Sequence, residues 1–227
     1  MKISTIVALV ILVLIGCHSS PQKQAPNIQN STSKESALHS KTERITDPRD
    51  GETYAIIKIG HQTWMAENAR FNSPGSIVNP DNPSKSYGRL YTITALQTAC
   101  PTGWHLPSDS EWDVLEIAHG MSDTLIGQGG QRGKHAIYMR TFEDWEEQNK
   151  TANSLNFNVL PAGYYASGKT GLPKGFEGLG FGAAFWSATE NEVTTARFMF
   201  AERDFINKWE DHNNETEMAL SCRCVKD

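Results

Sequence analysis

The sequence predicts an α+β domain built from small antiparallel sheets, with one or two helices and long loops. Three observations support this fold class. Short β-rich segments such as 53–59 recur along the chain, only residues 108–120 carry clear start and stop signals of a helix, and stretches rich in proline, glycine and asparagine such as 72–86 separate them. Few long helices combined with short strands are typical of α+β architectures.

Residues 1–17 are predicted to be a lipoprotein signal peptide. Lys2 supplies a positive charge, and the uninterrupted apolar segment 6–15 follows it. At helical rise this segment covers only about half of a hydrocarbon core, which favours a signal peptide over a membrane span. The segment ends in Leu-Ile-Gly-Cys at residues 14–17, which resembles a bacterial lipobox, so Cys17 is the expected lipidation site.

Lipidation predicts an exported protein that is anchored to the cell envelope through acyl chains. Several chains, each contributing about 0.8 kcal/mol per buried methylene, give a stable anchor. His18 follows the cysteine where an inner-membrane retention signal has aspartate, which favours the outer membrane. Residues 18–46 are polar and lack apolar periodicity, so we expect a disordered tether that spans roughly 30 Å.

Residues 47–227 remain for one domain of ordinary size. The whole chain has 21 basic and 26 acidic side chains, and residues 1–46 hold five of the basic and two of the acidic ones. The domain therefore carries 16 basic against 24 acidic side chains. This acidic balance argues against a nucleic-acid partner, which requires a basic surface.

The first half of the domain contains the clearest local patterns. Residues 53–59 and 62–65 are predicted to form a hairpin around Gly60-His61, and residues 93–99 a short helix. Ser108 and Glu111 form a capping box at the start of the main helix, which ends at Gly120. In the second half, 166–182 is expected to be mostly loop, and short strands are expected at 157–160, 185–189, 195–201 and 218–225.

Three cysteines lie in the domain: Cys100, Cys222 and Cys224. An exported protein permits disulfides, and an odd number allows one internal bridge and one free thiol. Cys222 and Cys224 would face the same side of a strand, so by spacing alone either is a partner for Cys100. A zinc site is not expected, because no CxxC pair or histidine spacing accompanies the cysteines.

Six blocks of the domain resemble the Fibrobacter succinogenes major paralogous domain, and they occur in the order found in that family. They are GETYAIIKIGHQTWMAEN (51–68), YGRLYT (87–92), CPTGWHLPSDSEW (100–112), FNVLPAGYY (157–165), FWSATE (185–190) and RCVKD (223–227). The resemblance implies a secreted or surface lipoprotein module. No biochemical activity is established for the family.

The blocks GWHLPSDSEW and RCVKD are also similar to elements of the formylglycine-generating-enzyme branch of the C-type-lectin-like fold. This similarity implies a compact α+β domain whose N- and C-terminal strands pair, with long loops on one side. It also implies a disulfide between Cys100 and Cys224, which leaves Cys222 unpaired. The oxidase activity of that branch is not expected, because residues 188–219, where its copper-binding cysteine pair would lie, contain no cysteine.

The remaining charged and polar motifs have simple structural interpretations. Trp209-Glu210-Asp211 is faintly similar to the calcium-binding element of lectins, but no accompanying Glu-Pro-Asn or Gln-Pro-Asp follows, so an exposed acidic loop is favoured. His105 is interpreted as a structural histidine, and Asp109 as a carboxylate that favours the helix dipole. An acidic cluster is interpreted as a solvated face: Glu143, Asp144, Glu146 and Glu147.

Two of the six tryptophans are candidates for ligand binding. Trp64, Trp104, Trp112 and Trp186 lie in the family blocks and are expected in the core. Trp145 and Trp209 lie in polar stretches, where an exposed ring would stack on a sugar or dock a partner; half-burial under a loop is the alternative.

The sequence therefore predicts a non-catalytic envelope lipoprotein whose domain binds a glycan or a protein. It lacks the GxSxG, HExxH and P-loop motifs. No cofactor is expected. The alternatives are a structural or assembly component of an envelope complex and, less favoured, an enzyme of unrecognised type.

Overall fold

The computed structural model describes residues 42–82, 84–142, 144–146, 153–169, 173–190, 193–211 and 217–227. The predicted signal peptide with Cys17, and residues 18–41 of the predicted tether, lie outside these ranges. Within the described ranges, no helix is long and apolar enough to cross a membrane.

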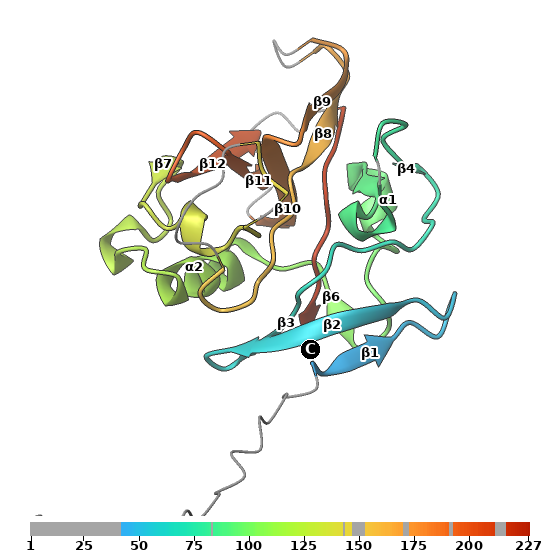
Figure 1. The fold of residues 1–227 in the computed structure, drawn as a ribbon, viewed down its shortest axis with the longest axis horizontal. Coiled ribbons are helices and arrows are strands. Elements are labelled where there is room, and N and C mark those ends of the chain that lie inside the picture. The colour runs from blue at the N-terminus through green and yellow to red at the C-terminus, as the bar shows by residue number, and fades with distance from the viewer. Residues whose placement is uncertain are drawn as a thin grey trace, which may run out of the picture. The chain divides into compact units, whose positions relative to one another are not determined.

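The described strands form three sheets (Figure 1). The five-stranded sheet has the order β1-β2-β3-β14-β6: β1 (Arg44–Thr46), β2 (Thr53–Ile59), β3 (Gln62–Met65), β14 (Val225–Lys226) and β6 (Trp104–His105). The seven-stranded sheet has the order β13-β8-β10-β11-β12-β7, with β9 paired to β8: β13 (Met218–Ala219), β8 (Ala162–Ala166), β10 (Gly182–Glu190), β11 (Val193–Phe200), β12 (Ile206–Asp211), β7 (Gly130–Arg132) and β9 (Gly175–Leu179). The small sheet pairs β4 (Ser76–Ile77) with β5 (Leu90–Tyr91).

The helices are α1 (Ile93–Leu96) and α2 (Asp109–Ala118), with 3₁₀ turns η1 (Lys85–Tyr87), η2 (Asp123–Leu125) and η3 (Ala136–Tyr138) among the described residues. The capping box predicted for α2 is present: the Ser108 hydroxyl accepts from the Glu111 amide, and the Glu111 carboxylate accepts from the Ser108 amide. The hairpin predicted at 53–59 and 62–65 is also confirmed, as β2 and β3.

The predicted α+β class is confirmed, with sheet as the dominant component. The pairing is antiparallel with one exception among the named strands, because β8 and β10 run parallel with Gly163 opposite Ala183. The two ends of the domain meet in the five-stranded sheet, where Val225 of β14 lies opposite Trp64 of β3 and His105 of β6.

Several predicted element boundaries were wrong. Residues 157–160 form no strand beyond a single bridge at Val159, and the predicted loop 166–182 contains β9. Trp209, Glu210 and Asp211 belong to β12 rather than to an acidic loop, whereas residues 212–216 lie outside the described ranges. Glycines interrupt the sequence of β9, and β12 contains several charged residues. Neither strand therefore shows the apolar alternation by which a strand is predicted.

The ordered domain begins before the predicted boundary at Asp47. Strand β1 lies within the predicted tether and pairs with β2, with Ile45 opposite Tyr54. Asp47 itself is buried, and its carboxylate accepts a hydrogen bond of 2.9 Å from the Arg49 side chain. An edge strand with mostly exposed side chains has a composition like that of a linker, so composition alone did not separate the two.

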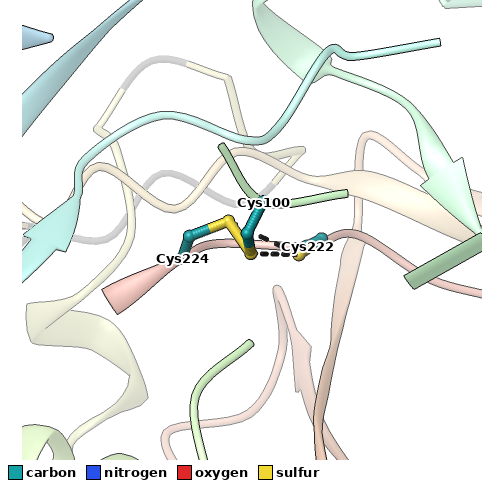
Figure 2. Close-up of side chains that lie close together, drawn as sticks. All are labelled: Cys100, Cys222 and Cys224. Atoms are coloured by element: carbon teal, nitrogen blue, oxygen red, sulfur yellow. Dashed lines mark hydrogen bonds between the residues drawn. A yellow bond between two sulfur atoms is a disulfide. The ribbon is translucent and has the colours of Figure 1, made fainter. Parts of the chain in front are cut away.

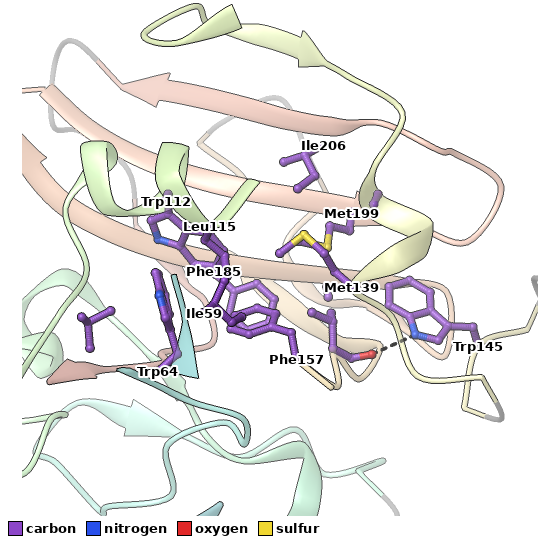
Figure 3. Packing of buried hydrophobic residues seen from close by; sticks show 14 of the residues in the cluster. Ile59, Trp64, Trp112, Leu115, Met139, Trp145, Phe157, Phe185, Met199 and Ile206 are labelled. Atoms are coloured by element: carbon purple, nitrogen blue, oxygen red, sulfur yellow. Dashed lines mark hydrogen bonds between the residues drawn. The ribbon is translucent and has the colours of Figure 1, made fainter. Parts of the chain in front are cut away.

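The main core lies between the five-stranded sheet, α2 and the seven-stranded sheet (Figure 3). Trp64 and Trp112 pack edge to face with ring centroids 5.2 Å apart, and Phe157 packs edge to face against both. Trp64, Trp112 and Trp186 are fully buried as predicted, whereas Trp104 is only half-buried. The Trp64–Trp112 contact joins the five-stranded sheet to α2, and the contact of Trp112 with Phe185 of β10, at a centroid distance of 5.7 Å, joins α2 to the seven-stranded sheet.

Candidate functional site

Trp145 is not a surface residue, so its proposed role in ligand binding is wrong. Its side chain is 3% exposed and belongs to the main core. The indole nitrogen donates a hydrogen bond of 3.0 Å to the Val159 carbonyl, and the Arg140 guanidinium lies 4.9 Å from the ring centroid. The polar local sequence did not reveal this burial, because the covering groups include residues from other parts of the chain, such as Val159.

Trp209 is half-buried on β12 and packs against a second core cluster. Its ring meets the edge of Phe198 at a centroid distance of 6.5 Å. Trp209 and Trp145 belong to different clusters, so they do not form a common aromatic surface.

Helix α2 presents carboxylates to cations of the seven-stranded sheet. We call the buried groups Asp109, Asp113, Glu116, Arg132, Arg197 and Lys208 the ion-pair layer. Arg197 contacts Asp109 at 2.7 Å and Glu116 at 2.8 Å, and Arg132 contacts Glu116 at 3.0 Å. Because each of these three contacts joins a carboxylate to a guanidinium, the arrangement is structural rather than that of a free acid–base pair.

Electrostatics within the ion-pair layer lower the pKa of two of its carboxylates, Asp109 and Glu116. Burial alone would raise the pKa of Asp109, but the charges of Arg197 and Lys208 outweigh it and lower the pKa to about 2. Burial alone would also raise the pKa of Glu116. A hydrogen bond from His135 and the charge of Arg197 outweigh burial, so the pKa of Glu116 is lowered. Asp109 therefore does more than favour the helix dipole, because it is a member of the buried network.

His105 is held between two carboxylates, as its structural interpretation requires. Its Nδ1 lies 2.7 Å from Asp227 and its Nε2 lies 2.9 Å from Glu111. Burial alone would lower the pKa of His105, but these two hydrogen bonds raise it. Both ring nitrogens are engaged, so His105 has no free nitrogen for a substrate in this arrangement.

The structure describes only part of the predicted acidic face. Asp144 and Glu146 are exposed, whereas Glu143 and Glu147 lie outside the described residues.

The cysteines meet in one place, which we call the cysteine cluster: Cys100, Cys222 and Cys224 (Figure 2). Cys100 and Cys224 form a disulfide, in agreement with the pairing that the resemblance implies, and Cys222 is a buried free thiol. The Cys222 sulfur lies 3.9 Å from that of Cys100 and 4.0 Å from that of Cys224. Burial raises the pKa of Cys222 to about 12, which makes it a poor nucleophile.

A cavity of about 610 Å³ lies between the β8–β9 hairpin, β13 and the start of α1. We call it the aromatic cavity. Tyr165 and Phe176 line it and contact one another edge to face, with ring centroids 5.2 Å apart. Polar groups share its wall: Thr92, Thr94, Ser167, Lys174 and Glu217. Half-buried rings beside hydroxyl groups make this cavity a better candidate for ligand binding than either predicted tryptophan.

The sequence carries a partial signal for the aromatic cavity. Tyr164 and Tyr165 are adjacent on β8, so their side chains point to opposite faces of the strand. Tyr164 packs into the second core cluster, and Tyr165 faces the cavity. Phe176 comes from β9, which was predicted to be loop, so its partnership with Tyr165 was hidden.

A family model described as the Fibrobacter succinogenes major domain matches residues 57–226. This match runs from the last residues of β2 through β14 and covers most of the chain. The chain belongs to this family. The resemblance seen in the six sequence blocks is thus confirmed. No curated protein and no solved structure matches the chain.

Proposed function

We propose that this chain is a non-catalytic, lipid-anchored envelope protein whose domain binds a glycan in the aromatic cavity. The observation that carries the proposal is the half-buried ring pair Tyr165 and Phe176 beside three hydroxyl side chains. Sugar rings have apolar faces that pack on aromatic rings and hydroxyl groups that bond to polar side chains. The cavity offers both kinds of contact on one wall.

The charged residues at the rim of the cavity match a neutral or mixed-charge ligand. Lys174 and Glu217 both line the cavity, and Glu217 also forms an ion pair with the exposed Lys169. Charges of both signs at one rim do not favour a strongly anionic or strongly cationic ligand.

The C-type-lectin-like fold is part of the proposal. Its support is the pairing of β3, near the start of the domain, with the C-terminal strand β14, the small number of helices among the described residues and the disulfide that joins Cys100 to the C-terminal segment. Anchoring at Cys17, and placement in the outer membrane, rest on the lipobox-like residues 14–17 and on His18.

A glycan array probed with a chain of residues 40–227, with and without calcium, tests the proposal. We expect selective binding that falls about tenfold or more in Tyr165→Ala and Phe176→Ala, because each change removes one ring of the pair. Phe142→Ala is the matched control, since Phe142 is 49% exposed and does not line the cavity. Circular dichroism verifies that each variant is folded.

The outcomes separate the candidate functions. Binding that disappears with a chelator would involve the acidic stretch 209–217 and a lectin-like calcium site. Binding that is insensitive to both ring substitutions would exclude the aromatic cavity. If no glycan binds, a protein partner or an assembly role in an envelope complex becomes the better proposal, and cross-linking in intact cells would identify the partner. Turnover of a cell-wall glycan would contradict the non-catalytic assignment.

A further inference from the structure

The three sulfurs of the cysteine cluster lie within 4.8 Å of one another. Cys222 is nearly equidistant from the two sulfurs of the disulfide, at 3.9 Å and 4.0 Å (Figure 2). It therefore lies beside the sulfur–sulfur bond. Thiol–disulfide exchange requires attack along the axis of that bond, so this position does not favour exchange.

The two distances from the Cys222 sulfur to the disulfide sulfurs match those expected around a bound metal ion. A metal ion bound by three thiolates at about 2.3 Å in a trigonal plane places the sulfurs about 4 Å apart. Two of the three sides of the triangle already have this length. The third side is the disulfide, and its reduction would free those two sulfurs to separate.

The main chain holds the cysteines in place independently of the disulfide. The amides of Met65 and Ala69 donate hydrogen bonds of 2.9 Å to the carbonyls of Cys224 and Cys222. Arg49 donates to the carbonyls of Thr98 and Ala99, directly before Cys100. Because these bonds do not depend on the disulfide, they would keep the three sulfurs close together after its reduction.

The ligand atoms and the apolar neighbours of the cysteine cluster determine which kind of metal ion would bind there. The group contains three sulfurs and no histidine or carboxylate among the described residues. Its neighbours are apolar or aromatic, including Met65, Tyr54 and Tyr91. Zinc in structural sites requires four ligands, whereas soft thiolates in a set of three suit Cu⁺.

A route to the cluster exists. Cys100 is half-buried and lines a cavity of about 440 Å³ together with Leu96, Trp104 and Leu106. Cys222 and Cys224 are fully buried behind it. A small reductant or a metal complex can therefore reach the cluster through Cys100.

We propose that reduction of the Cys100–Cys224 disulfide converts the cysteine cluster into a three-thiolate site for a soft monovalent cation, with Cu⁺ as its representative. A dithiol supplies two electrons and two protons to the disulfide and leaves as a cyclic disulfide. The cation then displaces the protons of the three thiols. The proposal does not depend on glycan binding.

The test is a Cu⁺ titration of the reduced full-length chain against a chromophoric Cu⁺ chelator. Cys17→Ser is present in every sample, so that only the three domain cysteines remain. We expect one equivalent of Cu⁺ and three sulfur neighbours at about 2.3 Å in X-ray absorption spectra. Cys222→Ala should leave two sulfurs and bind at least about tenfold more weakly, since even a supporting residue beyond the ligands costs that much in metal affinity.

The oxidised chain is the matched control and should bind no Cu⁺ at this site. Equal uptake by oxidised and reduced protein, or equal affinity in Cys222→Ala, would overturn the proposal. Near-UV circular dichroism monitors the fold. If reduction unfolds the domain, the proposal requires one equivalent of Cu⁺ to restore the folded signal, and failure to do so would also overturn it.

Discussion

The ion-pair layer and the cysteine cluster are both buried, but they hold the domain together in opposite ways. The ion-pair layer joins α2 to β7, β11 and β12 through charges, and Arg197 and Glu116 are fully buried within it. The cysteine cluster joins the segment before β6 to the segment before β14 through a covalent bond among apolar neighbours. The stability of the ion-pair layer depends on every charge having its partner, whereas the stability of the cysteine cluster depends on one cross-link.

Removing one charge from the ion-pair layer should have the largest effect. Arg197→Met leaves Glu116 and Asp109 without their shared cation, and breaking a buried ion pair on one side costs about 3–5 kcal/mol. Urea denaturation measures the loss. Arg203→Met is the matched control, because the exposed pair with Glu202 contributes about 0–1 kcal/mol. Equal effects of the two substitutions would mean that burial of the pairs is unimportant.

Removing the cross-link should have the next largest effect. The disulfide closes a loop with a sequence separation of 124 residues, so Cys100→Ala should cost about 2–5 kcal/mol. Cys222→Ala retains the disulfide and should cost only about 1 kcal/mol for the small cavity that it leaves. If Cys222→Ala destabilises the domain as much as Cys100→Ala, packing rather than the cross-link dominates this region.

Low pH should reduce the stability that the ion-pair layer contributes but not the stability that the cysteine cluster contributes. The pKa of Asp109 is about 2 in the folded domain, against an ordinary value of 3.8. A lowered pKa contributes stability above the ordinary value, and this contribution is lost as the pH falls from about 4 towards 2. Asp109→Asn should therefore be less stable at pH 7 but lose less stability over that window than the wild type, as measured by thermal unfolding. Cys100→Ala should keep the wild-type pH dependence, and a changed slope there would contradict the separation of the two regions.

The smallest effect is expected at the start of α2, which carries the carboxylates of the ion-pair layer. Ser108→Ala removes the acceptor for the Glu111 amide and should cost about 1 kcal/mol. Ser110→Ala is the control, because Ser110 is exposed and removing its hydroxyl, which lies 3.0 Å from that of Ser108, leaves the bond between the Glu111 amide and the Ser108 hydroxyl in place. Chemical denaturation of the two variants should differ by about that amount, and no difference would show that the layer fixes the helix without its cap.

Local patterns in the sequence determined the parts of the fold that depend on neighbouring residues. The hairpin β2–β3 and the capped helix α2 were predicted with nearly correct bounds, because turn chemistry and capping act over a few residues. The resemblance of six blocks predicted the family, and the separate similarity of the blocks GWHLPSDSEW and RCVKD to a second group of proteins implied the Cys100–Cys224 pairing.

Only the tertiary structure decided which distant groups surround particular side chains. Trp145 is buried by groups that include Val159, Asp109 is matched by Arg197 and Lys208, and Tyr165 meets Phe176 across two strands. The three cysteines converge although Cys100 and Cys222 lie 122 positions apart in the sequence. Burial, ion pairing and cavity formation depend on contacts between distant segments. Local periodicity does not indicate which distant residue will contact a given side chain.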